Sequence, residues 1–471
     1  MEKATGLLGI LVFLGLAVAF SRNRKAIDWR MVASSLAIQF VLALLLLRTG
    51  PGLYFFEKVG VLVHGLMETS QKGIGFVFGP LADDKGGSFF IFAVKVLPTI
   101  IFFASLVNVL FYLGVMQFVV SLISKIMRFV LRTSGAETLC ASANIFIGQS
   151  EAPLLILPYV PGLTESELLV VMVSGFATLA GGVMILYAGM LGQFLDSAAG
   201  HLLTASVLSA PASIMMAKII IPETEQSATS GDVKIDLPRT ESNVIEAAAA
   251  GAGTGLHLCL NVGAMLIAFI SLIALINGML GFILIPEGLQ ATLGAKVVSL
   301  ELILGWIFAP LAWLVGLPGK ASVLVGSLLG QSLVINEFVA YAGLKSHMAD
   351  GSLDPRSAVL AIYALCGFTN LSSIAIQIGG IGAMAEKRKG DLARLGFLAL
   401  FAATLTNLHT AALAGLLMKT EQYKPQPAAA IPSATPAPTA SPIATPVPEA
   451  TPAATATPAQ PQETPAPADD Q

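Results

Sequence analysis

Long apolar stretches separated by short charged loops make up most of the chain. Several of these stretches run for about 16 to 25 residues without a charge, the length at which a helix crosses a bilayer. Because lipid offers the backbone no hydrogen-bond partners, such segments must be helical. The pattern predicts eight membrane spans, at about 5–20, 31–47, 88–113, 166–190, 203–221, 259–283, 357–382 and 392–417.

Two further apolar stretches are interrupted by polar residues at their centres. They lie at 137–158 and 320–343, and each carries a conspicuous glutamate, Glu151 in the first and Glu337 in the second. Since both are too broken to be plain spans, we expect them to be re-entrant helical hairpins. Residues 51–80 and 115–132 carry several charges among their apolar positions, which is typical of helices at the membrane interface.

Basic residues gather in four of the connecting loops, at 21–30, 115–134, 222–242 and 386–394. Such loops stay on the cytoplasmic side of a membrane. All four share one side only if each span crosses once and both broken stretches turn back. The charges therefore predict that the first hairpin enters from the cytoplasm and the second from outside, and that both chain termini are non-cytoplasmic in a cytoplasmic membrane.

The polar centres of the two halves resemble each other. Gly148–Glu151 is matched by Gly330–Ser332, with Glu337 following, and Gly175–Leu179 is matched by Gly367–Leu371. Each repeat is thus a hairpin followed by a span with a polar break, and the opposite entry of the hairpins makes the repeats inverted. Inverted repeats with broken helices place substrate and ion sites near the membrane midplane.

Composition narrows the class of protein further. The chain is 55% hydrophobic and 12% charged, with a mean hydropathy of +0.79 and a net charge of −3. These values exclude an ordinary soluble domain and give no basic field for nucleic acid. Cys140, Cys259 and Cys366 lie singly in apolar segments, so neither a disulfide nor a metal site is indicated. The Pro/Ala/Thr-rich segment 424–471 is typical of a disordered tail.

The glutamates are the strongest candidates for function, because carboxylates inside a membrane are costly. Pro153 suits the first position of a helix, so Ser150 and Glu151 would lie at its N-terminus, where free N–H groups can bind a polar ligand. Alternatively these side chains only satisfy the hairpin tip itself. For Glu337, the alternative is a buried ion pair with Lys320.

The polar break in the second repeat is a further candidate. Thr369, Asn370, Ser372 and Ser373 fall within five residues of an apolar span. Hydroxyl groups there often serve only to pack helices together. An asparagine beside Gly367 is harder to explain in that way, so Asn370 is predicted to contact a ligand.

Three motifs resemble the concentrative nucleoside transporter family: Gly148–Pro153 (GQSEAP), Asn336–Tyr341 (NEFVAY) and Cys366–Ile374 (CGFTNLSSI). The similarity extends over about residues 88–418. It implies an all-α polytopic fold of eight spans and two re-entrant hairpins, with three protomers in the assembly. Ser150 stands where many members have threonine, which preserves the hydroxyl group.

The resemblance also implies roles for individual residues. The nucleobase would be bound by Gln149, Ser150, Glu151 and Val183. The ribose would be bound by Glu337, Phe368, Asn370 and Ser373. A Na⁺ ion would be held by the side chains of Asn144 and Thr178 and the carbonyls of Ile147 and Leu179. Oxygen ligands of this kind suit a hard cation.

Together these features predict a symporter that imports nucleosides with a cation, Na⁺ being favoured over H⁺, and that needs no cofactor. The Gly148–Gln149 pair resembles that of family members accepting both purine and pyrimidine nucleosides, which implies broad selectivity. An intramembrane enzyme and a channel remain as alternatives from other classes. We expect N-terminal spans and an interfacial helix in 1–87, a scaffold span and an interfacial helix in 88–134, and a scaffold span and an interfacial segment in 259–319. The transport repeats are expected at 135–221 and 320–418, a loop with an interfacial helix at 222–258, and a disordered tail at 424–471.

Overall fold

A computed structural model describes residues 2–82, 91–195, 197–229, 241–285 and 297–418. Within these residues the regular secondary structure is helical, with one isolated bridge between Leu284 and Val297. All of them belong to one compact unit, Met1–Pro425. The predicted tail, 424–471, lies outside the described residues.

Two helices of the N-terminal third begin at side-chain caps. The Asp28 carboxylate caps the second helix and the Thr49 hydroxyl caps the third, where Pro51 supplies a fixed φ in the first turn. In order, the helices are α1 (Glu2–Ala19), α2 (Trp29–Arg48), α3 (Gly50–Phe78), α4 (Phe92–Lys95), α5 (Thr99–Tyr112) and α6 (Val115–Leu131), with 3₁₀ turns at Arg24–Ala26 and Gly79–Leu81.

The first predicted repeat contains a hairpin and a broken helix. Its elements are α7 (Gly135–Ala143), the 3₁₀ helix η3 (Ala152–Gly162), α8 (Glu165–Phe176), α9 (Gly181–Gly192) and α10 (Ala198–Ile220). Pro153, Pro158 and Pro161 deprive η3 of backbone donors, which explains why this arm is not α-helical. The arms α7 and η3 pack against each other, as expected of a hairpin.

The second half contains the matching elements. They are α11 (Val244–Leu280), α13 (Leu300–Leu314), α14 (Gly319–Val334), α15 (Glu337–Ala349), α16 (Pro355–Ala364), α17 (Leu371–Met384), the 3₁₀ turn η4 (Glu386–Arg388) and α18 (Lys389–Leu417). α14 and α15 pack against each other on either side of Asn336, so the stretch at 320–343 is also broken at its centre.

Seven helical segments among the described residues are long and apolar enough to cross a membrane. They correspond to seven of the eight predicted spans. The eighth, 357–382, is divided into α16 and α17 by the break at 365–370. α13 and α14 form a further bent pair, at 115°.

One predicted boundary was wrong. The span expected at 259–283 begins at Val244, so the helical turns within the described parts of 222–258, residues 222–229 and 241–258, belong to α11 and form no separate interfacial helix. The Ala/Gly-rich turns before residue 259 are weakly apolar but fully helical. Two of their glycines let α11 approach α5: a Cβ on Gly251 would lie 2.7 Å from the Ala104 carbonyl oxygen, and one on Gly255 2.7 Å from the Ile101 Cα.

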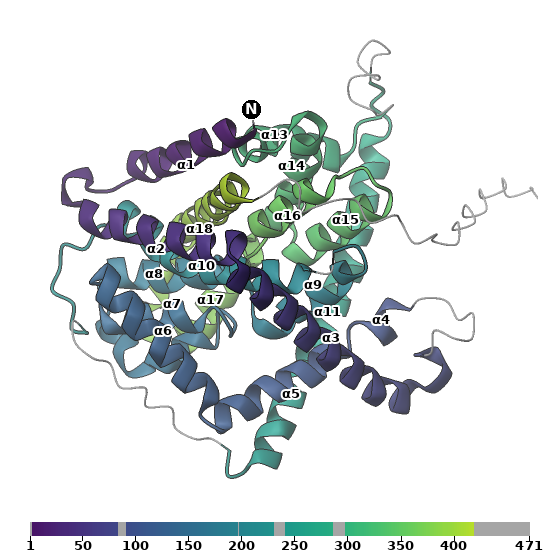
Figure 1. Ribbon diagram of the computed structural model, residues 1–471, viewed down its shortest axis with the longest axis horizontal. Coiled ribbons are helices and arrows are strands. Elements are labelled where there is room, and N and C mark those ends of the chain that lie inside the picture. The colour runs from purple at the N-terminus through teal and green to yellow at the C-terminus, as the bar shows by residue number, and fades with distance from the viewer. Residues whose placement is uncertain (1, 83–90, 196, 230–240, 286–296, 419–471) are drawn as a thin grey trace, which may run out of the picture. The chain divides into compact units, whose positions relative to one another are not determined.

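α18 lies at the centre of the buried core. It packs against α1, α8, α10, α16 and α17 (Figure 1). α5 and α11 pack chiefly on each other, and most of the apolar surface of α11 is exposed. The core thus unites the two broken helices, while α11 presents a large apolar face to lipid or to another chain.

Candidate functional site

The two broken helices meet at their breaks. A Cβ on Gly367, in the break between α16 and α17, would lie 2.5 Å from the carbonyl oxygen of Phe176 and 3.0 Å from the carbonyl carbon of Ala177. Only glycine permits this contact, because no side chain fits in the space. The matched Gly-Phe segments of the two halves therefore lie directly against each other.

Asn370 organises the start of α17. Its Oδ1 accepts hydrogen bonds from the Ser373 N–H at 2.8 Å and the Ser372 hydroxyl at 2.6 Å, which caps the helix. Its Nδ2 donates to Glu337 Oε2 at 2.8 Å. One side chain thus fixes the helix end and binds the carboxylate at the first turn of α15.

Neutral donors surround the Glu337 carboxylate. Tyr187 of α9 donates its hydroxyl to Oε1 at 3.3 Å, and the Tyr187 ring stacks on Tyr341 with centroids 4.0 Å apart. Glu337 is 8% exposed. Among the described residues no ion pair joins Glu337 to Lys320 or to any other base. A buried carboxylate without a cation is costly, and this cost is offset where a ligand supplies further donors.

The first hairpin reaches the same cluster through Gln149. Its Nε2 donates to Ser373 Oγ at 3.1 Å, and its Oε1 accepts from Gln377 of α17 at 3.3 Å. Hydrogen bonds from Gln149 to Ser373, and through Asn370 to Glu337, connect the two hairpins by way of α17. We call Gln149, Glu337, Asn370, Ser373 and Gln377 the midplane cluster.

Other predicted site residues lie around this cluster. Ser150 is half-buried and packs beside α17. A Cβ on Gly380 of that helix would lie 3.2 Å from the Cβ of Ser150. Glu151 is exposed, and its carboxylate accepts from the Gly148 N–H at 3.2 Å. Phe368 is partly buried against the core. The structure thus brings Gln149, Asn370, Ser373 and Glu337 into one hydrogen-bonded network, whereas among the described residues no side-chain hydrogen bond joins Glu151 or Phe368 to it.

A cavity of about 430 Å³ lies beside the hairpin tip. Glu151, Ile147 and Val183 line it together with residues of α5 and α11. Its dimensions suit a drug-sized polar molecule. It also contains Tyr112 and Glu241, at the ends of α5 and of the loop before α11, so it extends toward the side where the basic loops are expected.

The predicted cation ligands are also close together. Asn144 Nδ2 donates to Ser174 Oγ at 3.1 Å, and Thr178 Oγ1 donates to the Ser174 carbonyl at 2.8 Å. Asn144 Oδ1 is buried and has no hydrogen-bond partner within the described structure. The break after α8 removes the Leu179 carbonyl from regular helical bonding. A buried amide oxygen without a partner fits a site for a small cation.

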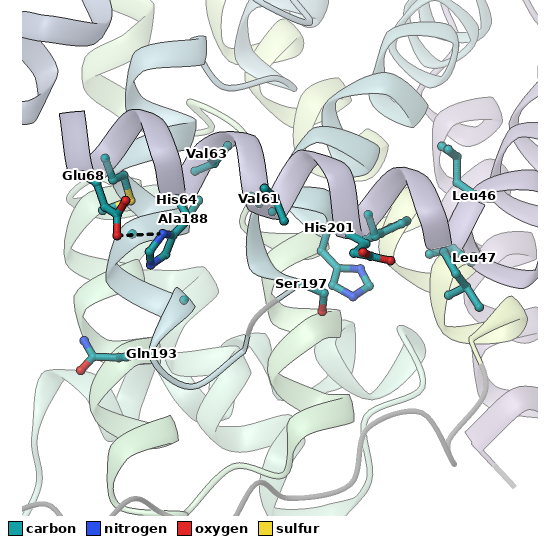
Figure 2. Close-up of a pocket in the computed structure, with 18 of the residues that line it drawn as sticks. Leu46, Leu47, Val61, Val63, His64, Glu68, Ala188, Gln193, Ser197 and His201 are labelled. Atoms are coloured by element: carbon teal, nitrogen blue, oxygen red, sulfur yellow. Dashed lines mark ion pairs between the residues drawn. The ribbon is translucent and has the colours of Figure 1, made fainter. Parts of the chain in front are cut away.

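A larger cavity, about 1,020 Å³, lies between α3 and the helices α9 and α10. Figure 2 shows α3 passing over it, with His64 and Glu68 paired at 3.6 Å and His201 below. None of the residues predicted from the motifs lines this cavity. Its walls are mainly apolar, so size alone does not identify the functional site.

Two residues of the site were not found from the sequence. Tyr187 lies in an apolar span, where tyrosines are common, and Gln377 stands alone in the apolar run Ile374–Ile378. Gln377 is 0% exposed and also donates to the Met172 carbonyl at 3.1 Å. An isolated glutamine in a predicted span was the available signal.

Family models cover most of the chain. The model described as Na⁺ dependent nucleoside transporter N-terminus matches residues 8–81, that described as nucleoside recognition matches 93–194, and that described as Na⁺ dependent nucleoside transporter C-terminus matches 201–415.

Several known proteins are similar over nearly the same length. The nucleoside permease NupC of Helicobacter pylori is 38% identical over 418 residues, 87% of this chain and 97% of that protein. The uncharacterized transporter YutK of Bacillus subtilis is 44% identical over 89% of this chain and 100% of its own. The solved structure of CNTnw in an inward-facing substrate-bound state has a TM-score of 0.80 and 41% identity, covering 88% of this chain and 98% of that chain.

Proposed function

The chain belongs to the Na⁺-dependent, concentrative nucleoside transporter family, and we propose that it imports nucleosides together with Na⁺. As its relatives are transporters, the protein is a transporter and not an enzyme. The observation that carries the proposal is the carboxylate of Glu337, buried among neutral donors and joined by hydrogen bonds to the first hairpin. Such a carboxylate is suited to accept hydrogen bonds from the hydroxyl groups of a sugar.

In this proposal the two ends of the nucleoside bind to different hairpins. The ribose hydroxyls donate to Glu337 and interact with Asn370 and Ser373, with Phe368 beside the sugar. The nucleobase hydrogen-bonds Gln149, Ser150 and Glu151 and packs on Val183. Support comes from the shared network and from the cavity that Glu151 and Val183 line. Each polar group of the substrate needs a partner, because an unpaired one costs about 1–3 kcal/mol.

Na⁺ binds in the proposal between the first hairpin and the break after α8. The Asn144 and Thr178 side chains and the Ile147 and Leu179 carbonyls supply the oxygens. The unpartnered Asn144 Oδ1 supports this assignment. Ion binding would hold the tip of the hairpin against α8 and so prepare Gln149 for the nucleobase, which couples the two ligands.

Coupling to one cation makes accumulation favourable. One charge moving inward through 100 mV contributes about 2.3 kcal/mol, which corresponds to roughly fifty-fold accumulation. We place the protein in a cytoplasmic membrane, with the basic loops inside and three protomers in the assembly. The exposed apolar face of α11 supports contact with lipid or neighbouring protomers.

Uptake into proteoliposomes tests the proposal, with Na⁺ and pH gradients imposed separately. Labelled uridine should accumulate chemically intact under an inward Na⁺ gradient alone. Accumulation driven only by a pH gradient would instead favour proton coupling, with Glu337 as the buried group able to carry the proton. Equilibration without accumulation would indicate a channel and refute symport.

A further inference from the structure

Gln377 holds Gln149 in one orientation. The Gln377 Nε2 donates to two acceptors, Gln149 Oε1 at 3.3 Å and the Met172 carbonyl at 3.1 Å. A backbone carbonyl can only accept, so the Gln377 amide must present its NH₂ group to this point. Gln149 must therefore present its oxygen to Gln377 and its NH₂ group to Ser373.

Both partners of Gln149 come from α17. Ser373 and Gln377 are four residues apart and lie on the same face of that helix. Space for the Gln377 amide exists only because residue 175 is glycine: a Cβ there would lie 2.6 Å from Gln377 Nε2 and 2.9 Å from Gln149 Cβ. The hairpin tip, α8 and α17 thus converge on one buried amide.

Reversing the Gln149 amide would be costly in this setting. Its NH₂ group would then face the NH₂ group of Gln377, so a buried hydrogen bond would be lost and two donors would oppose each other. Ser373 does not by itself impose an orientation, since its hydroxyl can donate or accept. The fixed element of the arrangement is the Met172 carbonyl, which acts on Gln149 through Gln377.

We infer that Gln377 is a positioning residue that determines which nucleobase edge Gln149 accepts. This inference rests on the proposed function, in which Gln149 binds the base. Uracil presents an N–H donor and a carbonyl acceptor where cytosine presents a ring-nitrogen acceptor and an amino donor. An amide held in one orientation distinguishes these two edges, and a reversed amide exchanges its donor and acceptor positions.

The substitution Gln377→Glu tests the inference. A neutral carboxyl group at 377 can donate to the Met172 carbonyl and accept from Gln149, provided that the Gln149 amide is reversed. KM should then rise for one of uridine and cytidine and fall for the other. We expect the ratio of their kcat/KM values to shift by about tenfold, since sites that read hydrogen bonds discriminate strongly.

Two variants serve as comparisons. Gln377→Met removes the constraint without imposing the opposite one, so its ratio should lie between those of the wild type and Gln377→Glu. Gln39→Glu is the matched control, because Gln39 is also 0% exposed but donates to Ser35 within α2. It should leave the uridine-to-cytidine ratio unchanged, and the Na⁺ concentration for half-maximal uptake should be the same in all four proteins.

The uptake results distinguish a failure of the inference about Gln377 from a failure of the proposed transport function. Wild-type uptake of both nucleosides with an unchanged ratio in Gln377→Glu would overturn the inference and leave the proposed function intact. Parallel changes in KM for both substrates would also overturn it, because they indicate general damage. If Gln377→Glu does not reach the membrane, an unchanged ratio in Gln377→Met decides against the inference. Absence of any nucleoside uptake by the wild type would reject both.

Discussion

Two buried polar clusters of this protein differ in how completely they are satisfied. In the midplane cluster, Glu337 has only neutral partners and Gln377 Oε1 has none within the described residues. In the second, which we call the basal cluster, Lys218 Nζ lies 2.8 Å from Glu137 Oε2 and 3.0 Å from Glu223 Oε2. The midplane cluster therefore contains buried polar groups without charged partners, whereas the carboxylates of Glu137 and Glu223 in the basal cluster are paired with Lys218.

The basal cluster joins the starts of two helices. Glu137 accepts from the Ser134 N–H in a capping box at α7, and Glu167 accepts from the Thr164 N–H in a second capping box at α8. Ser227 donates to Glu167 Oε1 at 2.5 Å, which adds the loop after α10. These contacts hold the hairpin base to its neighbours, which is a structural role.

The comparison shows that the partners of a buried carboxylate, rather than its burial, indicate whether it has a structural role or can bind a ligand. Glu137 and Glu337 are both almost inaccessible, at 1% and 8% exposure. Glu137 is paired with a lysine and has a structural role, whereas Glu337 has no cationic partner among the described residues and remains available to a ligand. The following predictions test this distinction, beginning with the largest effect.

Lys218→Met should destabilise the protein by about 3–5 kcal/mol, because it leaves Glu137 buried without its cation. Thermal unfolding of the purified protein in detergent would measure the change. Adding Glu137→Gln should restore part of the lost stability. A single variant as stable as the wild type would show that the basal cluster is not a structural ion pair.

Glu337→Gln should abolish uptake, a loss of at least about 100-fold, while leaving the protein folded and in the membrane. Loss of hydrogen bonds to a charged group costs about 1.5–3 kcal/mol, and the new NH₂ group would face one of the two donors, Tyr187 or Asn370. Uridine uptake and an unfolding curve on the same preparation measure both quantities. Glu165→Gln is the control, since its pairs with Arg22 and Arg394 lie near the surface and its uptake should persist. Normal transport by Glu337→Gln would refute the ribose role.

Asn144→Ala should raise the Na⁺ concentration for half-maximal uptake about tenfold, which corresponds to about 1.4 kcal/mol for one lost ligand. The ratio of uridine to cytidine uptake should not change, because Asn144 is not among the residues proposed to contact the base. Uptake measured over a Na⁺ series would show this. Ser142→Ala, two residues earlier near the end of α7, is a suitable control. An unaltered Na⁺ response in Asn144→Ala would remove this residue from the ion site.

Tyr187→Phe should have the smallest effect, raising the KM for uridine about threefold, as expected for the loss of one hydrogen bond worth about 0.5–1 kcal/mol. The ring can still stack on Tyr341, so stability should be retained. Initial uptake rates over a uridine series would measure KM. A loss of uridine uptake as large as that of Glu337→Gln would mean that Tyr187 does more than support the Glu337 carboxylate.

The sequence was most informative where polar residues interrupt apolar runs. Glu337 and Asn370 stood out for that reason, and both belong to the midplane cluster. α11 was predicted to start too late, because alanine and glycine at 247–255 are poor markers of a span although they form a helix. Gln377 was missed because its partner Gln149 lies 228 residues earlier, and no local pattern records such a contact.

The glycine at the junction of the two breaks has a mechanical consequence. At Gly367 the backbone lies against the backbone of Phe176 and Ala177, and the Asn407 side-chain amide is equally close, so α8–α9 and α16–α17 are tightly packed at their breaks. If α8–α9 slid past α16–α17, the Phe176 carbonyl oxygen would have to cross the space beside Gly367, which has no room even for a methyl group. Sliding between the two breaks is therefore disfavoured, and we expect α8–α9 and α16–α17 to keep this contact when the protein changes conformation.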